Sequence, residues 1–146
     1  MKISADASST PSTKDSHPTT MAHRKKVILV IIDHEEVREV VVLWLGGMGN
    51  YRVLAATDGL TSIPIATRET PDLILMDLCV AHRNDFDVIR KIKACPAIAH
   101  VPIVTISDRY WNAAATDQAL RLGCVDSLDK GSILDKIEAV IKRHLP

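Results

Sequence analysis

Four polar residues stand at or just beyond the ends of short β-type segments, where their side chains could act together. They are Asp33 after residues 27–32, Asp77 after 73–76, Ser107 after 101–106 and Lys130 after 124–128. Two neighbouring carboxylates repel each other, and a hard divalent cation and a lysine would relieve that repulsion. Mg²⁺ in proteins takes one or two carboxylates, several waters and a substrate phosphate. Two acids, a hydroxyl and an ammonium therefore predict a site that positions and neutralises a phosphoryl group during transfer.

The segments that precede these residues are typical of strands in a parallel sheet. Runs of four to six aliphatic residues suit strands that are buried on both faces. The expected strands are Val27–Ile32, Tyr51–Ala56, Asp72–Asp77, Val101–Ile106 and Cys124–Leu128. Segments with helical spacing alternate with them: Glu35–Leu45, Leu60–Glu69, Asp85–Ala94, Tyr110–Leu122 and Ile133–Leu145. Five βα units predict an α/β fold with a doubly wound parallel sheet, in which ligands bind at the carboxyl ends of the strands.

Three single residues carry further expectations about the helices. Pro64 is expected to delay the start of the second helix or to kink it, because proline is tolerated only in the first turn. Ser132 is expected to cap the last helix. Trp44 falls at a helical spacing with apolar neighbours, so we expect it in the core.

Composition limits the classes of protein to which the chain can belong. Its 146 residues suit one domain with a modest extension, and a hydrophobic fraction of 47% with 3% aromatic predicts an aliphatic core. Lys+Arg and Asp+Glu both number 18, so we expect no broad attraction to nucleic acid or to anionic membranes. Three cysteines without CxxC spacing indicate reduced thiols in a cytoplasmic protein. No apolar run approaches the length of a membrane span or forms a signal peptide.

The first 22 residues differ from the rest. Residues 1–22 are rich in Ser, Thr, Pro and Asp and contain too little aliphatic surface to offset the entropy of ordering, so they are expected to be disordered. Residues 23–146 form the predicted domain. Met21 precedes a basic cluster, and the sequence leaves open whether translation starts at Met1 or at Met21.

Residues 27–145 resemble the receiver domain of two-component response regulators. The resemblance covers nearly all of the chain beyond the leader and rests on four ordered motifs. These are Val27-Ile28-Leu29-Val30-Ile31-Ile32-Asp33, Pro71-Asp72-Leu73-Ile74-Leu75-Met76-Asp77-Leu78, Val101-Pro102-Ile103-Val104-Thr105-Ile106-Ser107 and Gly123-Cys124-Val125-Asp126-Ser127-Leu128-Asp129-Lys130. The resemblance implies a flavodoxin-like (βα)5 fold with strand order 2-1-3-4-5.

The resemblance also assigns roles to the polar residues. It implies that Asp77 accepts a phosphoryl group from a histidine kinase, a phosphotransfer protein or a small acyl phosphate. Asp33, Asp77 and the backbone carbonyl of Cys79 would bind Mg²⁺, and Ser107 and Lys130 would hold the phosphoryl group. Such a domain is a signalling module of a phosphorelay and not an enzyme.

The chain departs from the family pattern at several positions. Ile32 stands where the family usually has the first of two adjacent acids, which supports the metal through water; its loss predicts Mg²⁺ affinity weakened on the order of 10- to 100-fold. Asp85 stands where a glycine is common, and Asp108 replaces a small residue beside Ser107. Two more changes affect the fifth strand and the turn after it: Ser127 replaces the aromatic switch residue and Gly131 the proline after the lysine, so we expect a trans bond before Gly131.

These observations lead to one main hypothesis and two alternatives. The main one is a single-domain receiver phosphorylated on Asp77, with output through a downstream protein that binds the face of the fourth helix, fifth strand and fifth helix; a homodimer through that face stays open. The first alternative is a degenerate receiver that binds its partner independently of phosphorylation. The second is a flavin- or nucleotide-binding enzyme, which the absence of a GxGxxG or P-loop motif in the first βα turn disfavours.

Overall fold

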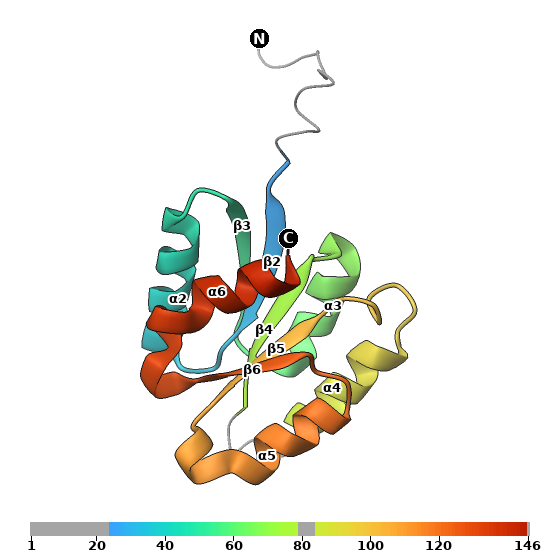
Figure 1. Cartoon of the computed structure of the whole chain (residues 1–146). Coiled ribbons are helices and arrows are strands. Elements are labelled where there is room, and N and C mark those ends of the chain that lie inside the picture. The colour runs from blue at the N-terminus through green and yellow to red at the C-terminus, as the bar shows by residue number, and fades with distance from the viewer. Residues whose placement is uncertain (1–23, 79–83, 146) are drawn as a thin grey trace.

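A five-stranded parallel sheet forms the centre of the protein (Figure 1). The computed structural model describes residues 24–78 and 84–145, and for residues 109–112 the backbone alone. The strands are β2 (Lys26–Ile31), β3 (Tyr51–Ala56), β4 (Leu73–Asp77), β5 (Ile103–Ser107) and β6 (Asp126–Asp129). Their order across the sheet is β3-β2-β4-β5-β6, which confirms the predicted order 2-1-3-4-5 and the doubly wound α/β class. The leader, residues 1–22, lies outside the described residues.

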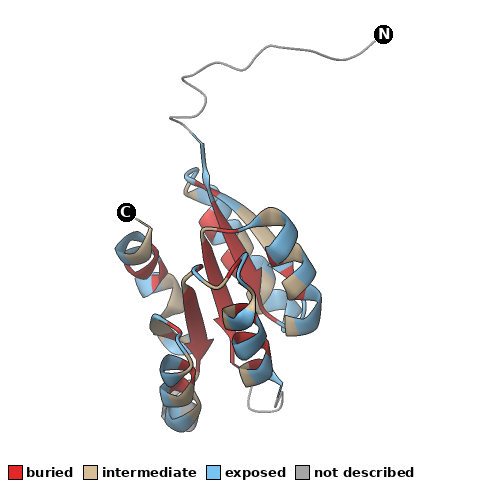
Figure 2. Ribbon diagram, turned by 90° about the vertical axis from the view of Figure 1, so that its right-hand side faces the viewer, coloured by how far each residue is buried: buried red, intermediate tan, exposed pale blue. Residues whose placement is uncertain are grey.

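Helices cover both faces of the sheet (Figures 1 and 2). They are α2 (Glu35–Gly47), α3 (Gly59–Glu69), α4 (Asp85–Ala94), α5 (Arg109–Arg121) and α6 (Ile133–His144), with the short 3₁₀ helix η1 (Lys130–Ser132) before α6. Two aliphatic clusters result, one beneath α2 and α6 and the other beneath α3, α4 and α5. Figure 2 shows the strands as the buried layer between half-exposed helices.

The three central strands, β2, β4 and β5, are buried on both faces because they consist mainly of aliphatic residues. Every residue of β4 and β5 is buried, as is every residue of β2 after Lys26. Full burial of one aliphatic side chain contributes roughly 1.5–3 kcal/mol. These strands therefore supply much of the folding free energy and hold their carboxyl ends in fixed register.

The start of α3 differs from the expectation. The side chain of Asp58 accepts a hydrogen bond from the backbone N–H of Thr61 at 2.8 Å, so this cap starts the helix at Gly59. Pro64 consequently lies inside the helix and not in its first turn, and the predicted late start is wrong. Sequence alone gave Pro64 too much weight because it did not recognise the cap that begins the helix five residues earlier.

Two other expectations about single residues were wrong. Trp44 is 47% exposed, because Val41 and Leu45, one turn apart on α2, take the positions that face the sheet. Ser132 occupies the N-cap position of α6, yet its side chain makes no capping hydrogen bond. The preceding η1 turn leads the chain into α6 instead.

Candidate functional site

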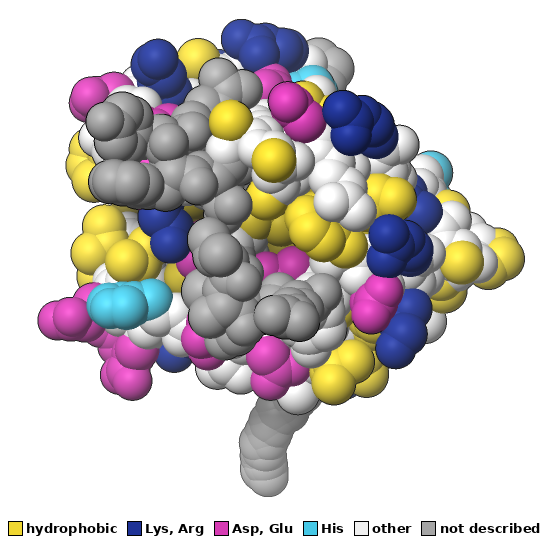
Figure 3. Space-filling model, turned by 90° about the horizontal axis from the view of Figure 1, so that it is seen from below, with side chains coloured by type: hydrophobic (Ala, Val, Ile, Leu, Met, Phe, Trp, Pro, Cys, Tyr) yellow, Lys and Arg dark blue, Asp and Glu magenta, His cyan; other side chains and the backbone are white. Residues whose placement is uncertain are grey.

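The carboxylates of Asp33 and Asp77 line one pocket at the carboxyl edge of the sheet. Strands β2 and β4 are neighbours, with Ile31 paired to Met76, so the residues that follow lie close together. The pocket has a volume of about 250 Å³. Its other lining residues are Ile31, Thr57, Asp58, Gly59, Asn84 and Asp85. Figure 3 views this edge and shows acidic side chains gathered around a hollow near its centre.

Asp77 is the most enclosed of the predicted site residues that carry a charge. Its side chain is 6% exposed, and the Lys130 ammonium lies 3.3 Å from its Oδ1. Lys130 follows β6 directly in the η1 turn, two strands away from β4 in the sheet. The structure thus brings Asp77 and Lys130, two of the predicted site residues, into contact.

Asp33 is held at the rim by its own helix. It is exposed, and Arg38 from the first turns of α2 donates hydrogen bonds to the carbonyls of Ile32 at 2.9 Å and Asp33 at 3.1 Å. The His34 side chain caps α2 by accepting from the N–H of Val37. These contacts fix the turn between β2 and α2. Arg38 was not singled out from the sequence, where it was one of several charged residues in an amphipathic helix.

Asp58 and Asp85 add two more carboxylates to the pocket. Asp85 is the first residue of α4 and is 8% exposed. The hydrogen bond from the Thr61 backbone N–H holds the pKa of Asp58 below its usual range, so this group stays ionised. The sequence reasoning missed Asp58, although it lies only two residues beyond the end of β3 and the rule applied to the other strand ends would have found it.

Ser107 lies next to the site but is engaged elsewhere. It is the last residue of β5, fully buried, and its hydroxyl is 2.6 Å from the hydroxyl of Thr116 on α5. The neighbouring strand brings Asp77 opposite Ile106, one residue before Ser107. The backbone of Ser107 is therefore at the predicted place, while its hydroxyl contacts a helix residue that the sequence analysis did not consider.

The donor set fits a hard divalent cation. Carboxylates of Asp33 and Asp77 on one pocket match the one or two that Mg²⁺ uses beside water and phosphate. Within the described residues, no three His, Cys, Asp or Glu side chains converge to hold a metal ion on their own. Cys79, whose carbonyl was predicted as a further ligand, lies outside the described residues.

The residues that depart from the family pattern differ in burial and in position. Ile32 is fully buried in the cluster beneath α2 and α6, so it acts as a core residue. Asp108 and Ser127 are half-buried. Gly131 lies in η1, and the described residues contain no cis peptide bond, which confirms the expected trans bond.

Comparison with known proteins identifies the family. The family model described as the response regulator receiver domain matches residues 28–142. The chain belongs to the response regulator receiver family. Receivers of this family serve two-component phosphorelay signalling and typically bind Mg²⁺.

Relatives of known name show the breadth of the resemblance. This receiver is 40% identical over 57 residues to the response regulator PleD of Caulobacter vibrioides, a match over 39% of this chain and 13% of PleD. It is 26% identical over 96 residues to sporulation initiation phosphotransferase F of Bacillus subtilis, a match over 66% of this chain and 75% of that protein. The chain thus spans a small part of PleD, and most of the second relative.

Solved structures share the fold. The receiver domain of sensor histidine kinase PA1611 from Pseudomonas aeruginosa, solved with magnesium coordinated in its active-site cleft, has a TM-score of 0.72 and 27% identity. The match covers 84% of this chain and 98% of that one. A putative response regulator from Chloroflexus aurantiacus has a TM-score of 0.76 at 20% identity, with coverage of 84% and 98%. In the part of this receiver that the structure describes, no helix is long and apolar enough to span a bilayer.

Proposed function

We propose that this receiver accepts a phosphoryl group on Asp77 in a Mg²⁺-dependent reaction and signals through protein partners. The observation that carries the proposal is the position of Asp77. Its side chain is almost fully enclosed, lines the same pocket as Asp33 and lies 3.3 Å from the Lys130 ammonium. A nucleophile, a metal-binding acid and a fixed cation are the parts that phosphoryl transfer requires.

The chemistry follows from these parts. A carboxylate oxygen of Asp77 attacks the phosphorus of a phosphohistidine or an acyl phosphate and forms a new O–P bond. The bond from phosphorus to the donor nitrogen or oxygen breaks, and the leaving group keeps the electron pair. Lys130 stabilises the negative charge on the transferred oxygens, because its ammonium already stands at the attacking carboxylate.

Asp33 and Asp77, with the Cys79 carbonyl, are the residues that would hold Mg²⁺. The ion supplies charge neutralisation for the phosphoryl oxygens. Arg38 fixes the turn that carries Asp33, so the metal-binding acid is positioned before the ion arrives. The hydroxyl of Ser107 is the remaining donor for the phosphoryl group, once it turns towards Asp77.

The proposed donor is a histidine kinase, a phosphotransfer protein or a small acyl phosphate. A relative named as a phosphotransferase, matched over three quarters of its length, supports a phosphorelay role. The proposed output is a protein partner that binds at α5, β6 and α6, and a homodimer would use the same face. We propose a cytoplasmic location for these partners and for the receiver.

Incubation with acetyl phosphate and Mg²⁺, followed by intact-protein mass spectrometry, tests the proposal. We expect a single phosphoryl adduct that is lost in Asp77→Ala and in the presence of EDTA. Asp87→Asn is the matched control, because Asp87 is an exposed acid that pairs with Arg90 on α4, outside the pocket. A wild-type protein without an adduct, or an adduct that persists in Asp77→Ala, would contradict the proposal.

A degenerate receiver that binds its partner without phosphorylation is the second candidate. Two observations favour it: Ile32 is a core residue where the family has an acid, and the buried Asp85 adds negative charge to the pocket. This candidate predicts that partner affinity is the same for wild type and for Asp77→Ala. A clear loss of affinity in Asp77→Ala would exclude it.

A further inference from the structure

We propose that Thr116 is a positioning residue that holds the Ser107 hydroxyl away from Asp77, and that phosphorylation releases α5 by breaking this hydrogen bond. The inference rests on the proposed function, since it concerns how the phosphorylated site reports its state. Thr116 would report phosphorylation to the partner surface. The residue at the family's aromatic switch position cannot do so in the usual way here, because that residue is Ser127.

The contact between the two hydroxyls is short and closed to solvent. Ser107 Oγ and Thr116 Oγ1 are 2.6 Å apart, at the strong end of the usual O–H···O range. Ser107 is 0% and Thr116 3% exposed, so water does not replace the bond when it breaks. The hydroxyl left behind is then buried without a partner, which is unfavourable. The bond therefore biases Ser107 towards α5 in the unphosphorylated protein.

The pleat of the sheet places Ser107 and Asp77 on opposite faces. Ser107 alternates with Ile103, which packs in the cluster beneath α3, α4 and α5. Asp77 alternates with Leu73 and Leu75, which pack beneath α2 and α6. The Ser107 hydroxyl must consequently turn across the strand end to reach a phosphoryl group on Asp77. It leaves Thr116 when it does so.

The anchoring of α5 makes this loss consequential. Among the α5 residues whose side chains the structure describes, only Thr116 and Ala119 are buried. An alanine methyl buries little apolar area, so among these described side chains the Thr116 hydrogen bond is a substantial part of the contact between α5 and β5. Its loss frees α5, which lies beside β6 and forms part of the proposed partner surface.

Binding of beryllofluoride with Mg²⁺, a stable mimic of the phosphoryl group, tests the role of Thr116. We expect Thr116→Val to bind beryllofluoride about 2- to 13-fold more tightly than wild type. In the variant, Ser107 has no hydrogen bond to Thr116 to break on binding, and the net contribution of one such bond corresponds to this change in affinity. Thr116→Ser keeps a hydroxyl and should restore the wild-type affinity. In a Ser107→Ala background, Thr116→Val should have no effect on affinity.

Hydrogen exchange of α5 gives a second readout. In wild type, the amides of residues 113–121 should exchange faster when beryllofluoride binds. In Thr116→Val these amides should exchange faster even without beryllofluoride. The amides of β4 serve as the control, because a general loss of folding would make them exchange faster as well. Should Thr116→Val fail to fold, Thr116→Ala removes the same hydroxyl, and the wild-type exchange change remains measurable.

The outcomes separate this inference from the proposed function. Wild type that binds beryllofluoride and forms the phosphoryl adduct, while folded Thr116→Val shows unchanged or weaker affinity, overturns the role of Thr116 alone. An effect of equal size in the Ser107→Ala background also overturns it. Wild type that neither binds the mimic nor forms the adduct overturns the proposed function, and this inference with it.

Discussion

The ammonium of Lys130 lies 3.3 Å from Oδ1 of Asp77, and the two residues come from strand ends that are not neighbours in the sheet. Strand β5 lies between β4 and β6, so Lys130 reaches over its end. The lysine side chain is 41% exposed and the aspartate side chain 6%. The pair thus joins an enclosed carboxylate to a cation that solvent and substrate can approach.

Removal of this cation should slow phosphorylation. We expect Lys130→Ala to lower the rate of phosphorylation by acetyl phosphate by about 10- to 150-fold, the range for one hydrogen bond to a charged group. The rate is measured by intact mass over time at fixed Mg²⁺. Lys142→Ala is the control, because Lys142 pairs with Glu138 at the surface of α6. A Lys130→Ala rate equal to that of the control would show that the ion pair has no part in transfer.

An acid introduced at position 32 should lower the stability of the fold and raise the affinity for Mg²⁺. Ile32→Asp places a carboxylate at a position that is 0% exposed within an aliphatic cluster, so we expect the free energy of unfolding in EDTA to fall by about 2–5 kcal/mol. We also expect Mg²⁺ affinity to rise about 10- to 100-fold. Thermal denaturation with Mg²⁺ and with EDTA checks both effects, because ion binding to the folded state raises the melting temperature.

Ile32→Val is the matched control for this prediction. It should lower the free energy of unfolding by only about 0.5–1.5 kcal/mol and leave Mg²⁺ affinity unchanged. If Ile32→Asp binds Mg²⁺ no more tightly than Ile32→Val, weak metal binding does not arise from the absent acid.

The sequence predicted the parts of this receiver that depend on backbone register. Aliphatic runs that end in Asp33, Asp77 and Ser107 define strands, and parallel strands place their carboxyl ends at one edge. The register of the strands then sets where the residues at their ends lie, and it brings Asp77 and Lys130 close together. The partner of the Ser107 hydroxyl did not follow, because it depends on how α5 docks and not on strand register.

Helix packing also explains the other errors. Trp44 has apolar neighbours in sequence, yet its exposure depends on which face of α2 turns towards the sheet, and Val41 and Leu45 determine that face. Spacing alone does not choose between two adjacent apolar stripes of one helix.

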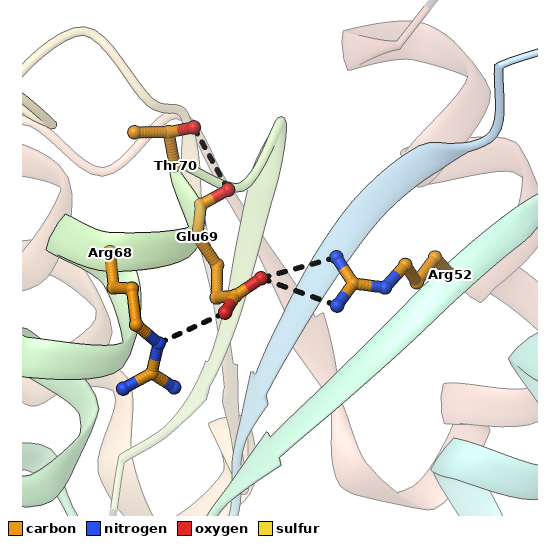
Figure 4. Close-up of polar contacts among 4 residues, drawn as sticks. All are labelled: Arg52, Arg68, Glu69 and Thr70. Carbon is orange, nitrogen blue, oxygen red and sulfur yellow. Dashed lines mark hydrogen bonds and ion pairs between the residues drawn. The ribbon is translucent and has the colours of Figure 1, made fainter. Parts of the chain in front are cut away.

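Thr70 ends α3 in a strained backbone conformation that glycine would relieve. Its φ is 43° and ψ 68°, in the left-handed region, which is unfavourable for a β-branched residue and for any residue before proline. Figure 4 shows its hydroxyl bonded to the carbonyl of Glu69, at 2.8 Å. We expect Thr70→Gly to raise the free energy of unfolding by about 0.5–1 kcal/mol, the relief of strain less the entropy of glycine in the unfolded chain.

Urea denaturation monitored by circular dichroism measures the effect of Thr70→Gly. Thr67→Gly serves as the control, because Thr67 lies within α3 and is also exposed. Glycine should destabilise that position by about 0.5 kcal/mol, so the two substitutions should have opposite signs. Destabilisation by both would mean that the left-handed conformation carries no strain.

The ionised side chain of Asp126 should stabilise the folded protein at neutral pH, and this contribution should be lost in acid. Burial alone would raise its pKa, but hydrogen bonds from His144, the Ser127 N–H and Arg143 outweigh burial and hold the pKa below its usual range. The carboxylate Oδ2 lies 2.7 Å from Arg143 Nη1 and 3.1 Å from His144 Nε2, which ties the end of α6 to β6. A carboxyl group with a lowered native pKa contributes stability above its unfolded value of about 3.9, and that contribution is lost as the pH falls through the native pKa.

Asp126→Asn isolates this contribution from those of Asp58 and Glu69, whose pKa values are also lowered and act in the same direction. At pH 7 we expect the variant to lose about 0.5–1 kcal/mol, because the Arg143 side chain is largely exposed. As the pH falls from the unfolded value of about 3.9 through the lower native pKa, the wild-type carboxyl becomes protonated in the folded protein as well, so the difference between the two proteins should shrink. Urea denaturation between pH 7 and pH 2.5 checks this, and a difference that stays constant over the whole range would show that the loss is steric and independent of the Asp126 charge.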